Sequence, residues 1–242
     1  MSTTQMDTLL IERFAALQSP LNRWRLNGYV RLKHLAWRCL TGGTRRIKRG
    51  FDAVASLLLL LLLSPLLLLL ALLIRLEDGG PVLFVQTRVG KWGRHFNMFK
   101  FRSMYVDAEP RLRGLLAQNQ HHEGVTFKMK NDPRITRVGK WLRRLSLDEL
   151  PQLVNVLTGD MSLVGPRPPV PHEVAVYSAA ERRRLMTTPG LTCLWQIGGR
   201  AEIDFSGQVQ LDIEYIESQS FWGDVKILLK TIPSVFSARG AS

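Results

Sequence analysis

The segment Ala53–Ile74 reads AVASLLLLLLLSPLLLLLALLI and carries no charge over 22 residues, fourteen of which are leucine. As a single helix it would be about 33 Å long at 1.5 Å per residue, which is enough to cross a hydrocarbon core of roughly 30 Å. It starts too far from the amino terminus for a secretory signal peptide, exceeds the length of that signal's apolar region, and lacks a small-residue cleavage site. The segment is therefore predicted to form a membrane helix.

A serine–proline pair, Ser64-Pro65, lies in the middle of this helix. Proline removes a backbone hydrogen-bond donor and its ring clashes with the preceding turn, so a kink or break is expected here. The Ser64 hydroxyl can bond to a backbone carbonyl that the break leaves free. Each half of the helix is then only about half as long as the hydrocarbon core is thick.

The charge on both sides of the apolar segment is positive. The chain has 33 Lys and Arg against 20 Asp and Glu, a net charge of +13, of which residues 1–50 contribute +8, Asp52 −1 and residues 75–242 +6. Basic flanks favour the cytoplasmic side of a membrane. Two arrangements are compatible with this pattern: a re-entrant helix that breaks at Ser64-Pro65 and returns to the side it entered from, and a kinked helix that spans the bilayer.

Residues 1–44 form a basic amphipathic extension. Its apolar residues recur at helical spacing, and arginines alternate with two tryptophans, Trp24 and Trp37, a composition that suits the headgroup layer of an anionic membrane. The same charge could attract nucleic acid, but the sequence contains no helix-turn-helix, zinc-finger or RNA-binding signature. Asp52, which follows this basic region, is expected to pair with a neighbouring cation in a structural role.

Residues 82–104 are predicted to form a β-hairpin. Apolar and polar residues alternate on both sides of the turn sequence Gly90-Lys91-Trp92-Gly93, which is the pattern of two paired strands. The second strand places Lys100 and Arg102 on one face, beside Arg88 from the first strand. Three cations there suit a phosphate or diphosphate, although an ordinary solvated strand face has the same composition.

Two adjacent carboxylates, Asp148 and Glu149, open a predicted helix. Ser146 and Glu149 have the spacing of a capping box, while Pro151 fits a helix start better if Asp148 is the cap. The positive end of a helix keeps carboxylates ionised and attracts anions. The pair is therefore a candidate for a nucleophile and a divalent-metal ligand, while acidic residues are also common in a first turn for structural reasons alone.

Arg167 lies between Pro166 and Pro168. Flanking prolines restrict the backbone, so the arginine can be held in place at little further entropic cost, as a fixed anion clamp requires. A proline-rich surface turn with an incidental arginine is the alternative. A second turn-rich patch, from Pro189 to Arg200, also ends in a cation.

Six motifs occur in order along the chain: Lys48-Arg49 with Asp52, Ser64-Pro65, Lys100 to Met104, Asp148 to Gln152, Gly165 to Pro168, and Pro189 to Arg200. Together they resemble the bacterial sugar transferase family, the monotopic polyprenyl-phosphate phosphoglycosyl transferases, from about residue 46 to about residue 237. The resemblance implies an α+β fold, rich in helices with a small β-hairpin or sheet, on a monotopic membrane anchor. The implied organisation is the extension 1–44, a membrane re-entrant helix 45–75 broken at Ser-Pro, and an interfacial catalytic domain 76–242.

The resemblance also implies a two-step reaction. Asp148 would attack the sugar-linked phosphorus of a UDP-sugar and release UMP, and a polyprenyl phosphate such as undecaprenyl phosphate would then take the sugar-1-phosphate from the enzyme. Glu149 would help to hold Mg²⁺, the implied cofactor, which neutralises the diphosphate. The implied phosphate ligands are Arg167 and, as further candidates, Lys100, Arg102, Arg88 and Arg200, with Asp212 as an accessory acid.

The implied place of this reaction is the cytoplasmic face of the bacterial inner membrane, where it would initiate an exopolysaccharide or a related surface glycan. The sugar stays open between glucose and galactose, and a homodimer is an expectation. The competing hypothesis from composition is a non-enzymatic basic scaffold that binds anionic lipid or polymer. A nucleic-acid partner is not expected, and the two cysteines, Cys39 and Cys193, have no spacing typical of a metal, redox or disulfide framework.

Overall fold

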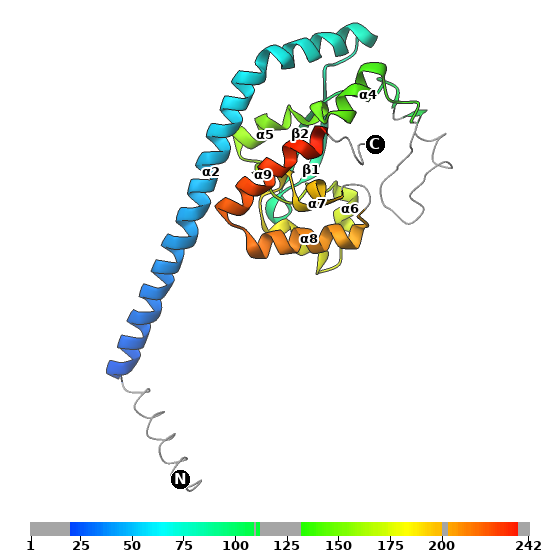
Figure 1. Cartoon of the computed structure of the whole chain (residues 1–242). Helices are drawn as coiled ribbons and strands as arrows, with labels where there is room; N and C mark the ends of the chain where they lie inside the picture. The colour runs from blue at the N-terminus through cyan, green and yellow to red at the C-terminus, as the bar shows by residue number, and fades with distance from the viewer. Residues whose placement is uncertain (1–19, 109, 112–131, 200–202, 237–242) are drawn as a thin grey trace. The chain divides into compact units, whose positions relative to one another are not determined.

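The computed structural model of the protein describes residues 20–108, 110–111, 132–199 and 203–236, with side chains from 45 to 234. The chain divides into two compact units, residues 1–48 and residues 49–242. The apolar stripes predicted within residues 1–44 lie outside the described side chains. The described residues of the larger unit form many helices and two small sheets, which confirms the predicted balance of helix and strand. Figure 1 shows the helices around the pair of strands β1 (Leu83–Val89) and β2 (His95–Phe101).

Helix α2 (Pro20–Asp78) continues through Pro65 without interruption. The Ser64 hydroxyl donates to the Leu61 carbonyl at 2.8 Å, and that carbonyl is the one that an amide at position 65 would otherwise bond. The helix bends in its cyan part (Figure 1). The predicted break therefore takes the form of a bend in a continuous helix, because the serine hydroxyl replaces the donor that proline lacks.

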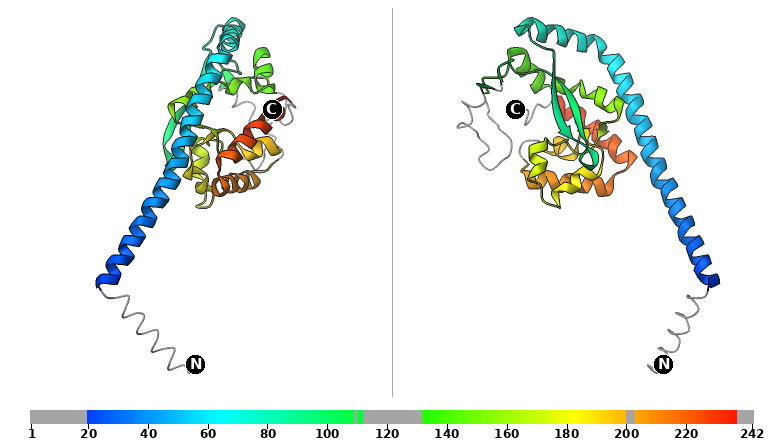
Figure 2. Two further views of the ribbon diagram at one scale, coloured as in Figure 1. Left: turned by 60° about the vertical axis from the view of Figure 1, so that its left-hand side comes forward. Right: turned by 180° about the vertical axis from the view of Figure 1, so that it is seen from behind.

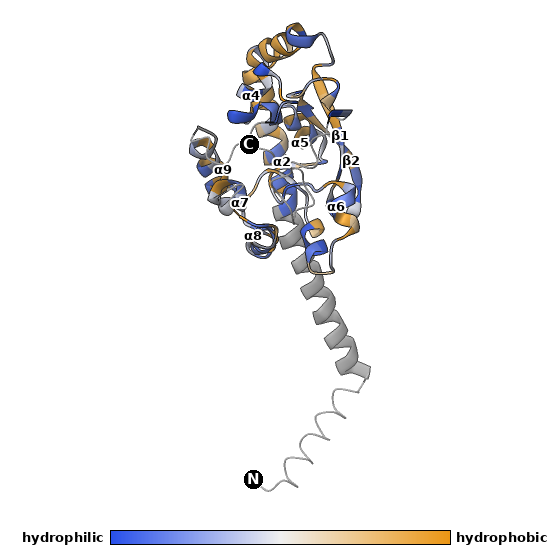
Figure 3. Cartoon of the chain, turned by 90° about the vertical axis from the view of Figure 1, so that its right-hand side faces the viewer, coloured by the Kyte–Doolittle hydropathy of each residue, from blue (hydrophilic) through white to orange (hydrophobic). Residues whose placement is uncertain are grey.

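The apolar part of α2 makes it a candidate membrane helix. Residues Arg45–Asp78 are long and apolar enough to cross a membrane by length and composition, and Figure 3 shows their leucine-rich part in orange. Leu70 and Ile74, beyond the bend, pack against Phe101 and Leu142 of the larger unit. The re-entrant placement of this helix stays a prediction.

Two side chains tie the start of the apolar segment to the rest of the larger unit. Arg49 donates through Nη1 and Nη2 to the carbonyls of Val156 and Leu157, both at 2.6 Å. These carbonyls lie at the carboxyl end of helix α5 (Gln152–Thr158), where a cation is favourable. Asp52 is buried and accepts hydrogen bonds from the Ser162 hydroxyl at 2.7 Å and the Leu163 amide at 3.3 Å. Asp52 thus bonds to a hydroxyl and an amide of the strand that contains Ser162 and Leu163. Sequence spacing does not reveal this contact, because the strand is distant along the chain.

Replacing Asp52 with alanine is expected to lower the free energy of unfolding by about 1–3 kcal/mol, because it leaves the buried Leu163 amide without this acceptor and removes the carboxylate that binds the Ser162 hydroxyl. Chemical unfolding in detergent micelles measures this change. Asp107→Ala is the matched control, since Asp107 is 54% exposed and its ion pair with Arg111 is a surface i,i+4 pair. The control is expected to cost less than about 0.5 kcal/mol. Equal losses in the two variants would contradict a structural role for Asp52.

The predicted β-hairpin is confirmed. Strands β1 (Leu83–Val89) and β2 (His95–Phe101) pair antiparallel, with Lys100 opposite Phe84 and Arg88 opposite Phe96. A short 3₁₀ turn, η1 (Lys91–Gly93), connects them. The right-hand view of Figure 2 shows the hairpin running along the outside of the larger unit.

The main core lies between the hairpin and the carboxyl-terminal helices. Its buried side chains come from Met161 and from five elements, β2, α5, strand β3 (Ser162–Val164), and helices α8 (Phe205–Ser218) and α9 (Phe221–Phe236). β3 pairs parallel with β4 (Gly190–Thr192). A Cβ on Gly190 would lie 2.0 Å from the Gly165 amide nitrogen, so the chains approach too closely here for any other residue. This contact fixes the point from which the Pro166–Pro168 loop leaves the core.

Candidate active site

The two adjacent carboxylates lie on a single turn between two helices. This turn, η3 (Leu147–Glu149), connects helix α4 (Arg137–Arg144) to α5. Ser146 precedes it with left-handed backbone angles (φ 54°, ψ 22°), and its side chain makes no capping hydrogen bond. The predicted capping box is therefore wrong: the Glu149 side chain binds two cations instead of the backbone before the helix.

Glu149 accepts hydrogen bonds from both of these cations. Lys100 Nζ, from β2, donates to Oε1 at 2.7 Å, and Arg167 Nη1, from the loop after β3, donates to the same oxygen at 3.2 Å. The Lys100 and Glu149 side chains are only 14% and 19% exposed, so water screens this ion pair little. The structure thus brings three predicted site residues together from three separate elements, and Asp148 adjoins them.

The two carboxylates differ in their pKa values. Burial and the negative charge of Glu149 raise the pKa of Asp148 to about 6, against the opposite effect of three nearby cations. Burial also acts to raise the pKa of Glu149, but the charges of Lys100 and Arg167 and their hydrogen bonds outweigh it and lower that pKa to about 2. At neutral pH both groups are ionised, and Asp148 is the more basic and the less stabilised as an anion.

Arg88 supports the loop that carries Arg167. Its Nη1 donates to the Pro168 carbonyl at 3.0 Å, and the amide of Val89 donates to the Pro169 carbonyl at 2.9 Å. Burial and the charge of Arg167 lower the pKa of Arg88 to about 10. The Arg88 guanidinium therefore lies near the cluster and holds the Pro166–Pro168 loop against β1. The sequence predicted Arg88 as a phosphate ligand but did not predict this positioning contact.

The structure gives Arg102 and Asp212 other partners. Arg102 is buried in an ion pair with Asp78 at the end of α2, because β2 ends at Phe101 and the chain turns toward that helix end. Asp212 is buried and accepts from Nε and Nη2 of Arg184 at 2.8 and 2.6 Å. Neither residue joins the Glu149 cluster. Arg200 lies outside the described residues.

The sequence of the whole folded unit matches a known protein family. A profile described as bacterial sugar transferase matches residues 43–238. The chain belongs to the bacterial sugar transferase family. Within it, the chain is 43% identical over 208 residues to the exopolysaccharide production protein ExoY of Rhizobium meliloti (strain 1021), an alignment that covers 83% of this chain and 92% of that protein.

Longer relatives in the family share the same region. The chain is 48% identical over 205 residues to the undecaprenyl-phosphate glucose phosphotransferase of Komagataeibacter xylinus, and 43% identical over 201 residues to the UDP-galactose-lipid carrier transferase of Erwinia amylovora. These alignments cover 80% and 82% of this chain but 36% and 42% of the relatives. The chain thus spans about two fifths of the length of these two proteins, and the family match confirms the resemblance seen in the motifs.

Sequence reasoning missed two residues that support this cluster. Arg143 on α4 is one of the cations that lower the pKa of Asp148, and its Nε donates to the Ser103 hydroxyl at 2.9 Å. Asn155 on α5 accepts from the Phe99 amide at 3.0 Å and donates to the Asn97 carbonyl at 2.8 Å. It therefore joins the helix after Glu149 to the strand that carries Lys100. For Asn155 the sequence did contain a signal, because it is a polar residue within the apolar run that follows Glu149 and is therefore expected to be buried.

The chemistry of the site fits Mg²⁺ bound together with a phosphate. Within the described residues no group of three or more His, Cys, Asp or Glu side chains gathers to hold a metal, so a closed protein cage is not found there. Mg²⁺ is usually bound through one or two carboxylates, with substrate phosphates and water completing its coordination. Asp148 and Glu149 supply that number of carboxylates, with Glu149 as the more strongly ionised of the two.

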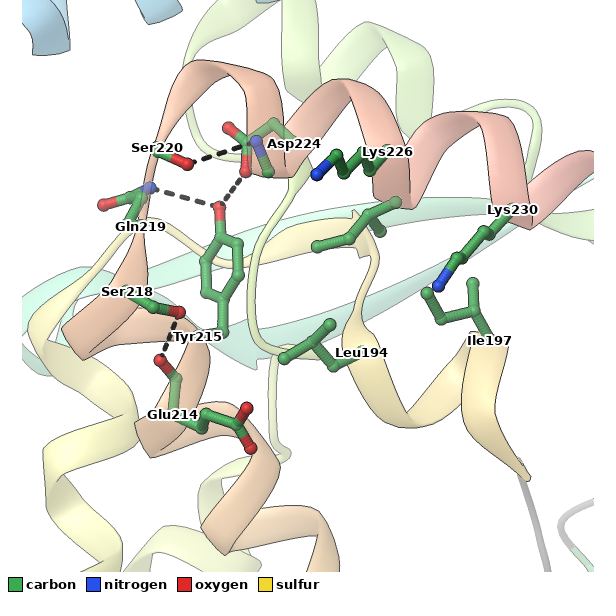
Figure 4. Close-up of a pocket in the computed structure, with 12 residues that line it drawn as sticks. Leu194, Ile197, Glu214, Tyr215, Ser218, Gln219, Ser220, Asp224, Lys226 and Lys230 are labelled. Atoms are coloured by element: carbon green, nitrogen blue, oxygen red, sulfur yellow. Dashed lines mark hydrogen bonds between the residues drawn. The ribbon is translucent and has the colours of Figure 1, made fainter.

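A hollow of about 220 Å³ lies elsewhere, between helix α7 (Leu194–Gly198), α8 and α9 (Figure 4). Its lining includes Tyr215, whose hydroxyl bonds Asp224 at 2.8 Å and Gln219 at 3.1 Å. None of the predicted site residues that the structure describes lines it. It is therefore separate from the Glu149 cluster.

Proposed function

We propose that this protein transfers sugar-1-phosphate from a UDP-sugar to a polyprenyl phosphate and releases UMP. The observation that carries the proposal is Asp148, a carboxylate with a pKa of about 6 beside a Glu149 that is held ionised by Lys100 and Arg167. A more basic, poorly stabilised carboxylate suits a nucleophile. The cations beside it suit the diphosphate that a nucleophile of this kind would attack.

In the first step a carboxylate oxygen of Asp148 forms a bond to the sugar-linked phosphorus, and the bond from that phosphorus to the bridging oxygen breaks. The bridging oxygen leaves with the electron pair as part of UMP, and the sugar-1-phosphate stays on Asp148 as an acyl phosphate. Arg167 and Lys100 bind the charge on the phosphoryl oxygens. Glu149, with Asp148 adjacent, would hold Mg²⁺, which would supply further positive charge against the diphosphate.

In the second step an oxygen of polyprenyl phosphate attacks the same phosphorus, and the bond to Asp148 breaks. The Asp148 carboxylate is regenerated, and the product is a polyprenyl diphosphate-linked sugar. One substrate is water-soluble and the other is a lipid, so the site belongs at a membrane surface. The long apolar helix and the basic flanks support the cytoplasmic face of the inner membrane, and the relation to ExoY supports a role in exopolysaccharide synthesis.

The released nucleotide tests this proposal. Purified protein with Mg²⁺ and undecaprenyl phosphate is incubated with a panel of UDP-sugars that includes UDP-glucose and UDP-galactose, since relatives named for each sugar exist. UMP is the expected product, and the sugar that yields it fastest identifies the donor. Release of UDP would indicate direct glycosyl transfer and would contradict the proposal. No turnover of any UDP-sugar would favour a non-enzymatic scaffold.

The first step is expected to depend on pH with a midpoint near 6. The reacting form of Asp148 is the anion, so UMP release falls as the pH drops below the pKa of about 6, while Glu149 with a pKa of about 2 stays ionised. A single-turnover measurement without polyprenyl phosphate is required, because a phosphate monoester itself titrates at about pH 6. A rate that is flat from pH 5 to pH 8 would contradict a titrating Asp148 nucleophile.

A further inference from the structure

Helix α9 has one face that packs into the folded unit and one face that does not. On the inner face Ile227 lies in the main core, and the buried Asp224 accepts a hydrogen bond from the Tyr215 hydroxyl at 2.8 Å. The outer face carries large apolar side chains that are 72%, 63% and 58% exposed: Trp222, Leu229 and Ile232. At 100° per residue these three lie within about 80° of arc. The helix is therefore amphipathic, with an apolar face turned outward.

This outer face begins beside the apolar segment of α2. Phe221, the first residue of α9, packs edge-on against Phe51 of α2 with ring centroids 5.3 Å apart, and its ring lies 5.6 Å from that of Trp222. Phe51 precedes the uncharged run, which begins at Ala53. Aromatic side chains are enriched at the level where a membrane helix enters the headgroup layer. The outer face of α9 thus starts at the point where α2 is expected to enter the membrane.

Two lysines flank the outer face on the side of the hollow between α7, α8 and α9. Lys226 and Lys230 line this hollow, and Figure 4 shows both side chains over Leu194 and Ile197. Both lysines are exposed, and neither forms an ion pair with a side chain that the structure describes. Among the described side chains of the lining, these two exposed cations outnumber one exposed carboxylate, Glu214. The edge of the apolar face therefore carries uncompensated positive charge.

We propose that α9 lies in the interfacial layer of a membrane that contains anionic phospholipid. Its outer face contacts the acyl chains, and Lys226 and Lys230 bind lipid phosphates at the edge of that face. An amphipathic helix with tryptophan and leucine on one side and lysines beside them has the composition of a membrane-surface helix. Lysines close to an anionic membrane surface are attracted to it.

Anionic lipid fits this surface better than a second copy of the chain does. The chain has a net charge of +13, so two copies repel each other, whereas an anionic membrane attracts each of them. The contact between Phe221 and Phe51 also makes the outer face continuous with the candidate membrane helix. The folded unit thus gains a second membrane contact besides α2, and this inference does not depend on the proposed function.

A probe on α9 that is quenched from within the bilayer tests this placement. Full-length protein with Cys39→Ser and Leu229→Cys is labelled with a small fluorophore at position 229 and reconstituted in vesicles of phosphatidylcholine and phosphatidylglycerol. Cys193 is only 2% exposed, so the folded protein is labelled at position 229. A lipid nitroxide on the upper acyl chain is expected to quench the probe by about threefold or more, because the apolar face of such a helix lies about 5–10 Å into the headgroup and acyl boundary.

The matched control carries Val176→Cys in place of Leu229→Cys. Val176 directly follows helix α6 (Pro171–Ala175) and is 68% exposed, close to the 63% of Leu229, so both substitutions replace an exposed apolar side chain of the same unit. The probe at position 176 is expected to be quenched by a water-soluble nitroxide and little by the lipid nitroxide. Equal quenching of the two probes by the lipid nitroxide would overturn the proposal.

A second copy on the outer face would give a different result. The probe at position 229 would then be shielded from both nitroxides, and unlabelled Leu229→Cys would form a disulfide-linked dimer under oxidation while Val176→Cys would not. That combination would assign the face to a dimer and would also overturn the proposal.

The two lysines are tested by the lipid composition. A larger share of phosphatidylglycerol is expected to increase the quenching at position 229, and Lys226→Gln with Lys230→Gln is expected to remove most of this increase. An increase that persists without the lysines would contradict their binding to lipid phosphates. None of these measurements uses a UDP-sugar, so a failure here is distinct from a failure of the proposed function.

Discussion

Replacing Asp148 with asparagine is expected to reduce UMP release and sugar-1-phosphate transfer by at least about 10³-fold, because the amide cannot form the acyl phosphate. The same variant is expected to unfold at a higher temperature than the wild-type protein. The folded state raises the pKa of Asp148 from its ordinary value to about 6, so above pH 6 the ionised group costs the protein stability. The neutral amide removes that cost.

Single-turnover UMP release and thermal unfolding at pH 7.5 measure these two effects together. Loss of activity with a higher unfolding temperature is a combination that damage to the fold does not produce. Full activity in Asp148→Asn would remove Asp148 as the nucleophile. A lower unfolding temperature would show that the charge of Asp148 is compensated in the folded protein, contrary to its raised pKa.

Replacing Glu149 with glutamine is expected to reduce activity by about 10²–10³-fold, an effect similar to that of removing one preorganised charge-stabilising group. The neutral glutamine no longer balances the positive charges of Lys100 and Arg167. In the wild-type protein Lys100 Nζ and Arg167 Nη1 lie 2.7 and 3.2 Å from Oε1 of Glu149. Stability is expected to fall as well. The folded state lowers the pKa of Glu149 to about 2, so its charge contributes stability that is present above its ordinary pKa and is lost as the pH falls toward 2.

The residual activity of Glu149→Gln also reports on Asp148. The negative charge of Glu149 helps to raise the pKa of Asp148, so without it the midpoint of the pH profile is expected to move below 6. A higher Mg²⁺ concentration is expected to be needed for half-maximal rate. An unchanged midpoint would contradict the coupling between the two carboxylates, and an unchanged Mg²⁺ requirement would contradict metal binding by Glu149.

The isosteric replacements at positions 148 and 149 are thus expected to change stability in opposite directions. The two residues are neighbours in the same turn and both are half-buried. What separates them is that Glu149 meets two cations directly, whereas among the described residues no side chain donates a hydrogen bond to Asp148. Burial and the charge of Glu149, which two cations stabilise, therefore keep the proposed nucleophile Asp148 basic.

Local sequence was sufficient for the features that depend on neighbouring residues. The uncharged leucine run predicted a long apolar helix, and the alternating residues around the Gly90–Gly93 turn predicted the hairpin. Ser64 fills the hydrogen bond that Pro65 cannot make, as their adjacency suggested. These outcomes follow from backbone geometry within one or two turns of chain, which a sequence specifies directly.

The partners of the charged residues were decided by tertiary structure. Lys100 and Arg102 are two residues apart in sequence, yet one binds Glu149 and the other Asp78, because the strand ends between them. Asp52 bonds Ser162, which is 110 residues away. An ion pair or hydrogen bond depends on where a side chain's tip lies to within an ångström or so, and only the packing of the whole unit sets that position. Sequence alone predicted the candidate residues of the site, while the fold determined that Glu149 binds two cations and that the pKa of Asp148 is raised.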